Sequence, residues 1–136
     1  MVQTLAQKLV ARAAGRSSVT PGEIVTCKVD LAMMHDSGGP RRVKPMLERL
    51  GAKVWDPSKV VVITDHYVPT FDEDSRKIIR IARDWVQEAG IENFYDEQGI
   101  CHVVLPVESS ATRPSFEILD CNSISASNAF ASAAMW

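Results

Sequence analysis

The sequence contains few cysteines, little net charge and no long apolar run. Its three cysteines are odd in number and irregularly spaced. They do not form a disulfide framework, which favours a reducing compartment. The formal net charge of -2 provides no field that would attract nucleic acid or an anionic lipid surface. No apolar run approaches the roughly 20 residues of a membrane span. These absences exclude nucleic acid and membrane as partners and predict a cytoplasmic protein.

Residues 1–18 contain no acidic side chain and three basic ones, Lys8, Arg12 and Arg16. This composition resembles a mitochondrial transit peptide, so a mitochondrial location is the alternative to the cytoplasm. A plain helix over residues 5–14 is the preferred interpretation. Thr4 can cap its first turn and Gly15 can end it.

Four β-branched residues at 60–63 form the run around which the chain is organised. A run this short and branched is typical of a strand buried on both faces of a sheet covered by helices. Asp65 and His66 follow it directly, and ligands of open α/β sheets bind just beyond the carboxyl ends of strands. Position therefore makes Asp65 and His66 a candidate catalytic pair. The alternative is that Asp65 caps a turn and His66 is merely exposed.

Helical and strand periodicities alternate along the rest of the chain. The clearest helix has an apolar face that includes Trp85, which is predicted to lie in the core. This alternation predicts an α/β fold, a three-layer α/β/α-like partial domain with a mostly parallel sheet. The predicted strands cover residues 25–33, 60–63, 92–95 and 99–106, and the predicted helices cover residues 5–14, 43–51 and 72–89.

Two further polar segments are candidates for function. Residues 35–40 read His-Asp-Ser-Gly-Gly-Pro, and backbone N–H groups of such a loop can bind a carboxylate or phosphate, although it can also be a simple turn. Cys101 and His102 lie in the predicted strand 99–106. Neighbouring strand residues point to opposite faces, so this pair alone does not form a metal site. A lone His102 would be a structural residue, and no metal ligand is predicted.

The composition changes after Ser109, where charged residues become rare and serine, alanine and asparagine become frequent. We therefore divide the chain into an α/β part at residues 1–108 and a divergent tail at residues 109–136. A reading-frame shift, alternative splicing or truncation would explain such a tail.

Several motifs resemble, in order and spacing, the N-terminal part of the aconitase superfamily over about residues 4–106. The resemblance is to the large subunit of 3-isopropylmalate dehydratase and to homoaconitase-type hydro-lyases. It rests on the segments Thr4–Gly15, Pro21–Val25, His35–Pro40, Pro57–Val62, Asp65–His66 and Gly99–His102.

The resemblance implies a function and a set of site residues. Such enzymes remove or add water across a carbon–carbon bond of a hydroxy acid, here isopropylmalate-like or homocitrate-like, as in leucine biosynthesis. They use a 4Fe-4S cluster and, in many cases, a separate small swivelling subunit. The motifs imply catalytic roles for Asp65, His66, His102 and Asp120, and substrate contacts for His35, Asp36 and Ser37.

The sequence also departs from the family pattern. An Asp-Ser-His motif of the family corresponds here to Asp120-Cys121-Asn122, and asparagine carries no proton near neutral pH. Cys27, Cys101 and Cys121 match none of the cluster ligands of the family. We therefore expect no cluster on this chain and no catalysis by the chain alone, which would need the missing domains or a small subunit.

Two alternatives come from other functional classes. The chain could be a non-enzymatic module that binds a carboxylate or another subunit. It could also be a small zinc protein, although its histidine and cysteine spacing fits no zinc pattern.

For the site itself, Asp65, His66 and His102 are predicted to converge. Parallel strands joined by a helical crossover bring their carboxyl ends to the same edge of a sheet. The alternative places His102 on the opposite face of the sheet, inside the core.

Overall fold

The structure, a computed structural model, describes residues 3–105 and a short strand at residues 118–120. Its elements are α1 (Leu5–Ala13), β1 (Leu31–His35), α2 (Pro40–Leu50), the 3-10 turn η1 (Pro57–Lys59), β2 (Val60–Thr64), α3 (Glu73–Ala89), β3 (Asn93–Asp96) and β4 (Ile118–Asp120). Residues 101–105 form a further helical turn. The domain boundary predicted at residue 108 lies outside the described residues.

The strands form one sheet in the order β3-β2-β1-β4, and every neighbouring pair is parallel. In the register, His35 lies opposite Ile63, and Thr64 lies opposite Asp96. The carboxyl ends of β1, β2 and β3 therefore reach the same edge of the sheet. The predicted parallel α/β sheet is confirmed, as is the strand predicted at residues 60–63.

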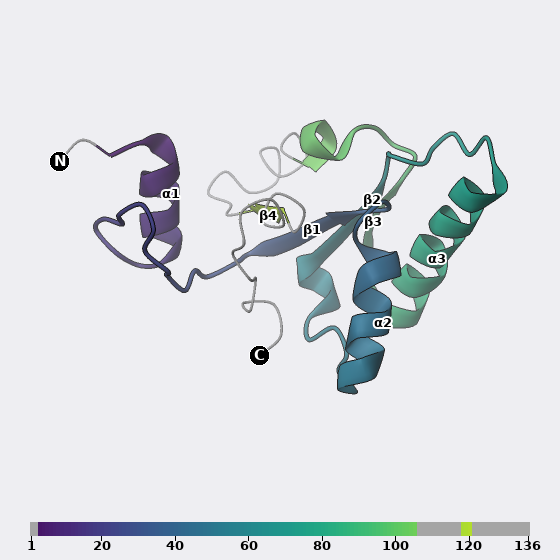
Figure 1. Ribbon diagram of the computed structural model, residues 1–136, viewed down its shortest axis with the longest axis horizontal. Coiled ribbons are helices and arrows are strands. Elements are labelled where there is room, and N and C mark those ends of the chain that lie inside the picture. The colour runs from purple at the N-terminus through teal and green to yellow at the C-terminus, as the bar shows by residue number, and fades with distance from the viewer. Residues whose placement is uncertain (1–2, 106–117, 121–136) are drawn as a thin grey trace.

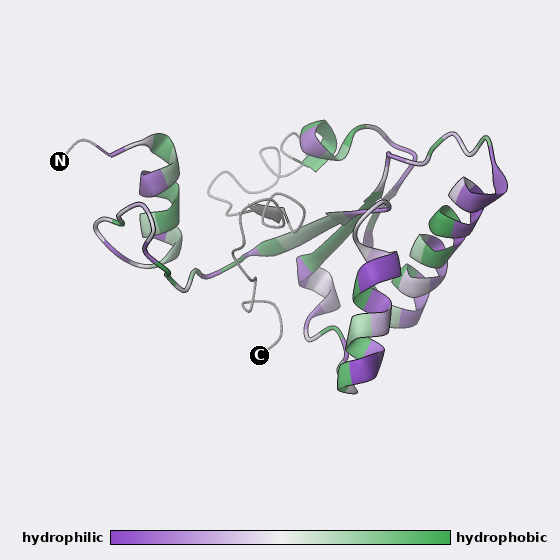
Figure 2. Ribbon diagram, viewed as in Figure 1, coloured by the Kyte–Doolittle hydropathy of each residue, from purple (hydrophilic) through white to green (hydrophobic). Residues whose placement is uncertain are grey.

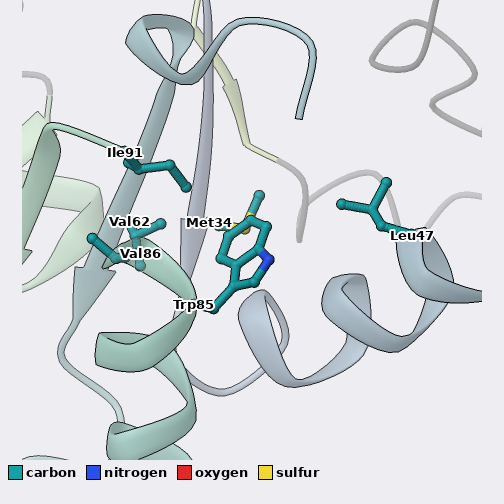
Figure 3. Packing of buried hydrophobic residues seen from close by; sticks show 6 residues of the cluster. All are labelled: Met34, Leu47, Val62, Trp85, Val86 and Ile91. Carbon is teal, nitrogen blue, oxygen red and sulfur yellow. The ribbon is translucent and has the colours of Figure 1, made fainter. Parts of the chain in front are cut away.

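Helices α2 and α3 cover one face of this sheet, and residues 101–105 lie on the other (Figure 1). The face under the helices is packed by Met34 and Val62 from the strands against Leu47, Trp85 and Val86 from the helices (Figure 3). The opposite face is packed by Met33, Val61, Ile63, Cys101 and Leu105. Both faces of β2 are thus buried, which explains its continuous apolar run. The strands of the sheet are mostly green in Figure 2.

Helix α3 has the boundaries that its capping residues dictate. The Asp72 carboxylate accepts a hydrogen bond from the Ser75 amide at 2.8 Å, and Gly90 closes the helix in a left-handed conformation. Helix α2 begins at Pro40, three residues before the predicted start. Proline lacks a backbone N–H, but the N–H groups of a first helical turn have no partner within the helix. Pro40 can therefore be the first residue of α2. A Cβ on Gly39 would meet the His35 carbonyl oxygen at 2.7 Å, so this junction requires glycine.

Helix α1 lies apart from the sheet, beside the chain that links it to β1 (Figure 1). The predicted cap is confirmed: Thr4 and Gln7 form a reciprocal capping box. The strand predicted at residues 25–33 is wrong over its first six residues, since β1 starts only at Leu31. Before that point the chain runs beside α1, where the Lys28 amide binds the Ala13 carbonyl at 2.8 Å. Its hydrogen bonds therefore go to the helix and not to a sheet.

The strand predicted at residues 99–106 is also wrong, because residues 101–105 are helical. Glu97 and Gly99 both have positive φ, which turns the chain away from the sheet edge after β3. The amides of Val103 and Val104 then bind the Ile100 carbonyl, both at 2.9 Å. The apolar residues at 101 and 105 are buried on the second face of the sheet as one side of a helical turn.

Within the described part of the chain, no helix combines the length and apolarity needed to cross a bilayer.

Candidate functional site

The candidate site lies where β1 and β2 end side by side. His35 is the last residue of β1 and Asp36 follows it, while Asp65 and His66 follow Thr64 at the end of β2. The Asp36 amide donates a hydrogen bond to the Ile63 carbonyl at 3.1 Å, so the two chain ends remain joined beyond the strands. The parallel register therefore brings together residues that are thirty positions apart in sequence.

Asp65 and His66 form the closest polar contact of the site. Asp65 Oδ1 lies 2.5 Å from His66 Nδ1, and its other oxygen accepts a hydrogen bond from the Cys101 amide at 2.7 Å. The Asp65 side chain is 5% exposed and that of His66 is 42% exposed. A carboxylate held in this way fixes the orientation and tautomer of an imidazole. Because much of the His66 ring stays accessible, it can exchange a proton with a bound molecule.

His35 stacks on His66, with ring centroids 3.9 Å apart and planes inclined by 10°. Ser37 Oγ lies 2.8 Å from His35 Nδ1, at the edge of that ring. His35 is largely buried. The loop predicted to contact substrate therefore supplies a second imidazole directly beside the catalytic candidate.

Asp36 is buried at the end of β1. Its side chain is fully buried, and its two oxygens accept hydrogen bonds from the amides of His66 at 3.2 Å and Tyr67 at 2.9 Å. The carboxylate thus binds the protein backbone, and the substrate contacts predicted for His35, Asp36 and Ser37 stay predictions.

His102 and Asp120 are placed less closely. His102 is exposed on the helical turn whose first amide binds Asp65, so the premise that it lies in a strand is wrong. Its predicted convergence with His66 stays a prediction. Asp120 belongs to β4 and lies opposite Met33 in the register. The predicted catalytic roles of both residues also stay predictions.

His35, Asp36, Asp65 and His66 each offer a ligand atom, and these atoms lie within 4.8 Å of one another. Such a group has the composition of a divalent-metal site. Both Nδ1 atoms are engaged, however, one near Ser37 and the other with Asp65. A cation bound through these two nitrogen atoms would have to displace both contacts.

A neighbouring network at the same sheet edge was not predicted from the sequence. Thr64 donates a hydrogen bond to Asp96 at 2.7 Å, and Arg83 from α3 donates to Asp96 at 2.8 Å. The signal in the sequence is that Thr64 and Asp96 each end a strand. This network fixes the ends of β2 and β3, immediately before Asp65.

The environment of Asp65 lowers its pKa. Burial raises it, but hydrogen bonds from the Cys101 amide and the His66 ring outweigh burial, so the pKa lies below its ordinary value. Because the folded-state pKa is below that of the unfolded chain, ionised Asp65 stabilises the fold above the unfolded pKa of about 4. This stabilisation is lost as the pH falls through the lowered folded-state pKa.

We expect Asp65→Asn to reduce the free energy of unfolding by about 1–3 kcal/mol near pH 7, because the variant removes a charged acceptor of two hydrogen bonds. The deficit should shrink as the pH falls below about 4, where the wild type loses the same charge. Urea unfolding between pH 3 and pH 7 measures both quantities. Asp74→Asn is the control, since that side chain is 91% exposed, and it should change stability by less than about 0.5 kcal/mol. A deficit that does not vary with pH would contradict the assignment.

Comparison of the sequence with known proteins finds relatives over most of the chain. No model of a protein family matches the chain. The 3-isopropylmalate dehydratase large subunit 1 of Methanopyrus kandleri is 42% identical over 124 residues, covering 90% of this chain and 29% of the relative. A protein of Methanothermobacter thermautotrophicus named "probable methanogen homoaconitase large subunit" is 41% identical, covering 88% of this chain and 29% of the relative. The chloroplastic 3-isopropylmalate dehydratase large subunit of Arabidopsis thaliana is 37% identical, covering 88% and 26%.

The chain therefore spans between a quarter and a third of the length of these relatives. Identity at this level extends over almost the whole of the chain, and the parallel α/β sheet with its strand-end histidines and carboxylates lies within it. Over this portion, the chain belongs to the aconitase-family large subunits of 3-isopropylmalate dehydratase and homoaconitase.

Proposed function

We propose that this site serves in the removal and addition of water across a carbon–carbon bond of an isopropylmalate-like or homocitrate-like hydroxy acid. The observation that carries the proposal is the contact between Asp65 and His66 at 2.5 Å, at the carboxyl end of a parallel strand. The names of the relatives support the choice of substrate class. As an isolated chain the protein is proposed to be inactive, since it spans only a part of those relatives.

The chemistry suits a carboxylate–imidazole pair. Elimination of water requires a base that accepts a proton from carbon and an acid that donates one to the departing hydroxyl. With its Nδ1 proton directed to Asp65, the His66 ring presents Nε2 for such a transfer. We propose His66 as the proton carrier, Asp65 as its orienting carboxylate and His35 and Ser37 as substrate contacts. His102 and Asp120 remain further catalytic candidates on the resemblance alone.

The residues described here do not fit the iron–sulfur cluster of the family. A cluster needs thiolates that converge on one point. Of the described cysteines, Cys101 is fully buried in the core beneath the sheet, and Cys27 lies beside α1 with its thiol 3.8 Å from the Val10 carbonyl. These two come from separate parts of the fold, and Cys121 lies outside the described residues. We therefore assign no step of the reaction to a cluster on this chain.

We predict that the chain alone does not form a stable cluster, because its described thiols are on different elements. Anaerobic reconstitution with iron and sulfide should leave no broad visible absorption after desalting. Retention of stoichiometric iron with that absorption would contradict the prediction.

The partners are proposed from the same comparison. Relatives named as large subunits support a separate small subunit, together with the further domains that their greater length contains. We propose the cytoplasm as the compartment, on the reducing environment that the free thiols of Cys27 and Cys101 suit.

A chimera tests the proposal in a complete enzyme. In the chimera, residues 3–105 of this chain replace the matching portion of the Methanopyrus kandleri large subunit. The chimera is co-expressed with the small subunit of that organism. We expect the chimera to form the unsaturated acid from 3-isopropylmalate. Ultraviolet absorbance of that product measures the reaction. A chimera that assembles and contains its cluster but lacks turnover would overturn the hydro-lyase role. If that chimera still binds the acid, the chain is a carboxylate-binding module.

A further inference from the structure

Asp36 joins the ends of the two central strands through backbone amides. It follows β1 directly, yet its carboxylate accepts the amides of His66 and Tyr67, which follow β2. A fully buried carboxylate is costly unless donors surround it, and here two donors come from one short segment of backbone. The arrangement fixes that segment against the end of β1.

The same carboxylate lies at nearly equal distances from the two stacked imidazoles. Asp36 Oδ1 is 3.9 Å from His35 Nδ1 and 3.8 Å from His66 Nδ1. These distances exceed hydrogen-bond length, so Asp36 makes no direct hydrogen bond to either Nδ1 atom. Its hydrogen bonds determine where the backbone that carries His66 lies, and that backbone determines where the His66 ring lies.

We propose that Asp36 is the positioning residue of this site, holding the backbone of His66 and Tyr67 so that the His66 ring stacks on His35. Its importance for turnover rests on the proposed function, whereas the positioning itself is a property of the chain alone. We assign Asp36 this positioning role on its contacts with the two amides. It serves the site through His66, which receives its orientation from Asp65 at the ring and from Asp36 at the backbone.

The alternative explanation of the stacked pair is that Asp65 alone orients His66. Asp65 reaches only Nδ1 of the ring, at 2.5 Å. A contact at one ring atom allows the ring to follow any movement of its own backbone. The amide contacts of Asp36 restrict that backbone, so the two carboxylates have separate roles.

Hydrogen exchange of the intact chain gives the first test. The amides of His66 and Tyr67 lie beyond the end of β2, where strand pairing does not protect them. If Asp36 binds them, they should exchange far more slowly than unstructured amides. Exchange of both amides at the rate of an unfolded chain would overturn the proposal, with no variant needed.

Asp36→Asn gives the second test, because asparagine keeps the shape but has one acceptor oxygen in place of two. One of the two amides should then exchange about 10- to 100-fold faster, as for loss of a hydrogen bond to a charged group. The ring protons of His35 and His66 should also lose the mutual shifts that stacking causes. Unchanged exchange and unchanged ring shifts in a folded variant would overturn the proposal.

Asp72→Asn is the matched control, since Asp72 also accepts a backbone amide, that of Ser75 at 2.8 Å, but at the start of α3. It should accelerate exchange at Ser75 and leave the two imidazoles unchanged. Loss of ring stacking in this variant as well would show a general effect of lower stability and count against Asp36. Since no substrate is used, these readouts stand apart from the chimera assay, and either proposal can fail without the other.

Discussion

Replacing His66 by glutamine in the chimeric large subunit is expected to lower turnover of 3-isopropylmalate about 10²- to 10⁴-fold, the usual contribution of a general acid or base. Glutamine can occupy the space of the ring but carries no proton between donor and acceptor near neutral pH. The KM should change much less than kcat, because substrate contacts are assigned to His35 and Ser37. Initial rates at several substrate concentrations measure the two constants.

Two controls make this result specific to the imidazole. Lys77→Gln changes a side chain that is 61% exposed on α3 and should leave turnover within about twofold, as expected of a surface change. Iron content should be equal in all chimeras, so that a lost cluster is not mistaken for a lost proton carrier. If the His66→Gln chimera retains its cluster and more than a tenth of the turnover, His66 is not the proton carrier.

The sheet and the main helices could be predicted because local signals determine them. The run at residues 60–63 is apolar on both faces, and only a strand covered on both sides buries it. Helix α3 combines an apolar face with a capping Asp72 and a closing Gly90, so its period and both ends agree. The pairing of β1 with β2 follows from this order, since the helix between them enforces a parallel crossover.

Residues 101–105 could not be assigned from the sequence because a short apolar run fits either a strand or a buried helical turn. The decision depends on the turn before it, where Glu97 takes a positive φ that its residue type does not indicate. The Asp65 carboxylate then captures the Cys101 amide. The conformation of Glu97 and the contact between Asp65 and Cys101 are not encoded in the local pattern of residue types. The sequence pattern therefore could not predict the helical turn.

The arrangement of the candidate site could be predicted only in part, for the same reason, and the roles of its residues stay predictions. Position after a strand identified Asp65 and His66, and the glycine-bearing loop identified His35 to Ser37. The stack of the two rings and the burial of Asp36 depend on the register of two strands, which pairs His35 with Ile63. They also depend on the chain after β2, which brings His66 beside His35 and Asp36. A sequence pattern gives the strand ends but not their relative alignment to within one residue. The distinction between a substrate contact and a positioning carboxylate depends on that alignment.

Trp85 provides the largest expected effect on stability. Its side chain reaches from α3 into the core formed with Met34, Leu47 and Val62, as Figure 3 shows, and the residue is 5% exposed. It thus contacts both the neighbouring helix and the sheet. The predicted apolar face of the helix at residues 72–89 is confirmed by this burial.

Trp85→Ala is expected to reduce the free energy of unfolding by about 3–5 kcal/mol, because it removes a large buried ring and leaves a cavity between α2, α3 and the sheet. Trp55 offers a matched control within the same chain, since it is 71% exposed. Lys59 Nζ lies over its ring, 5.1 Å from the ring centroid. Trp55→Ala should cost less than about 1 kcal/mol, the scale of an exposed cation–π contact. Urea unfolding followed by circular dichroism compares the two without relying on the altered fluorophores. If α3 packs against the sheet, removal of a tryptophan side chain is costly only at the buried position. Equal losses for the two variants would therefore contradict that packing.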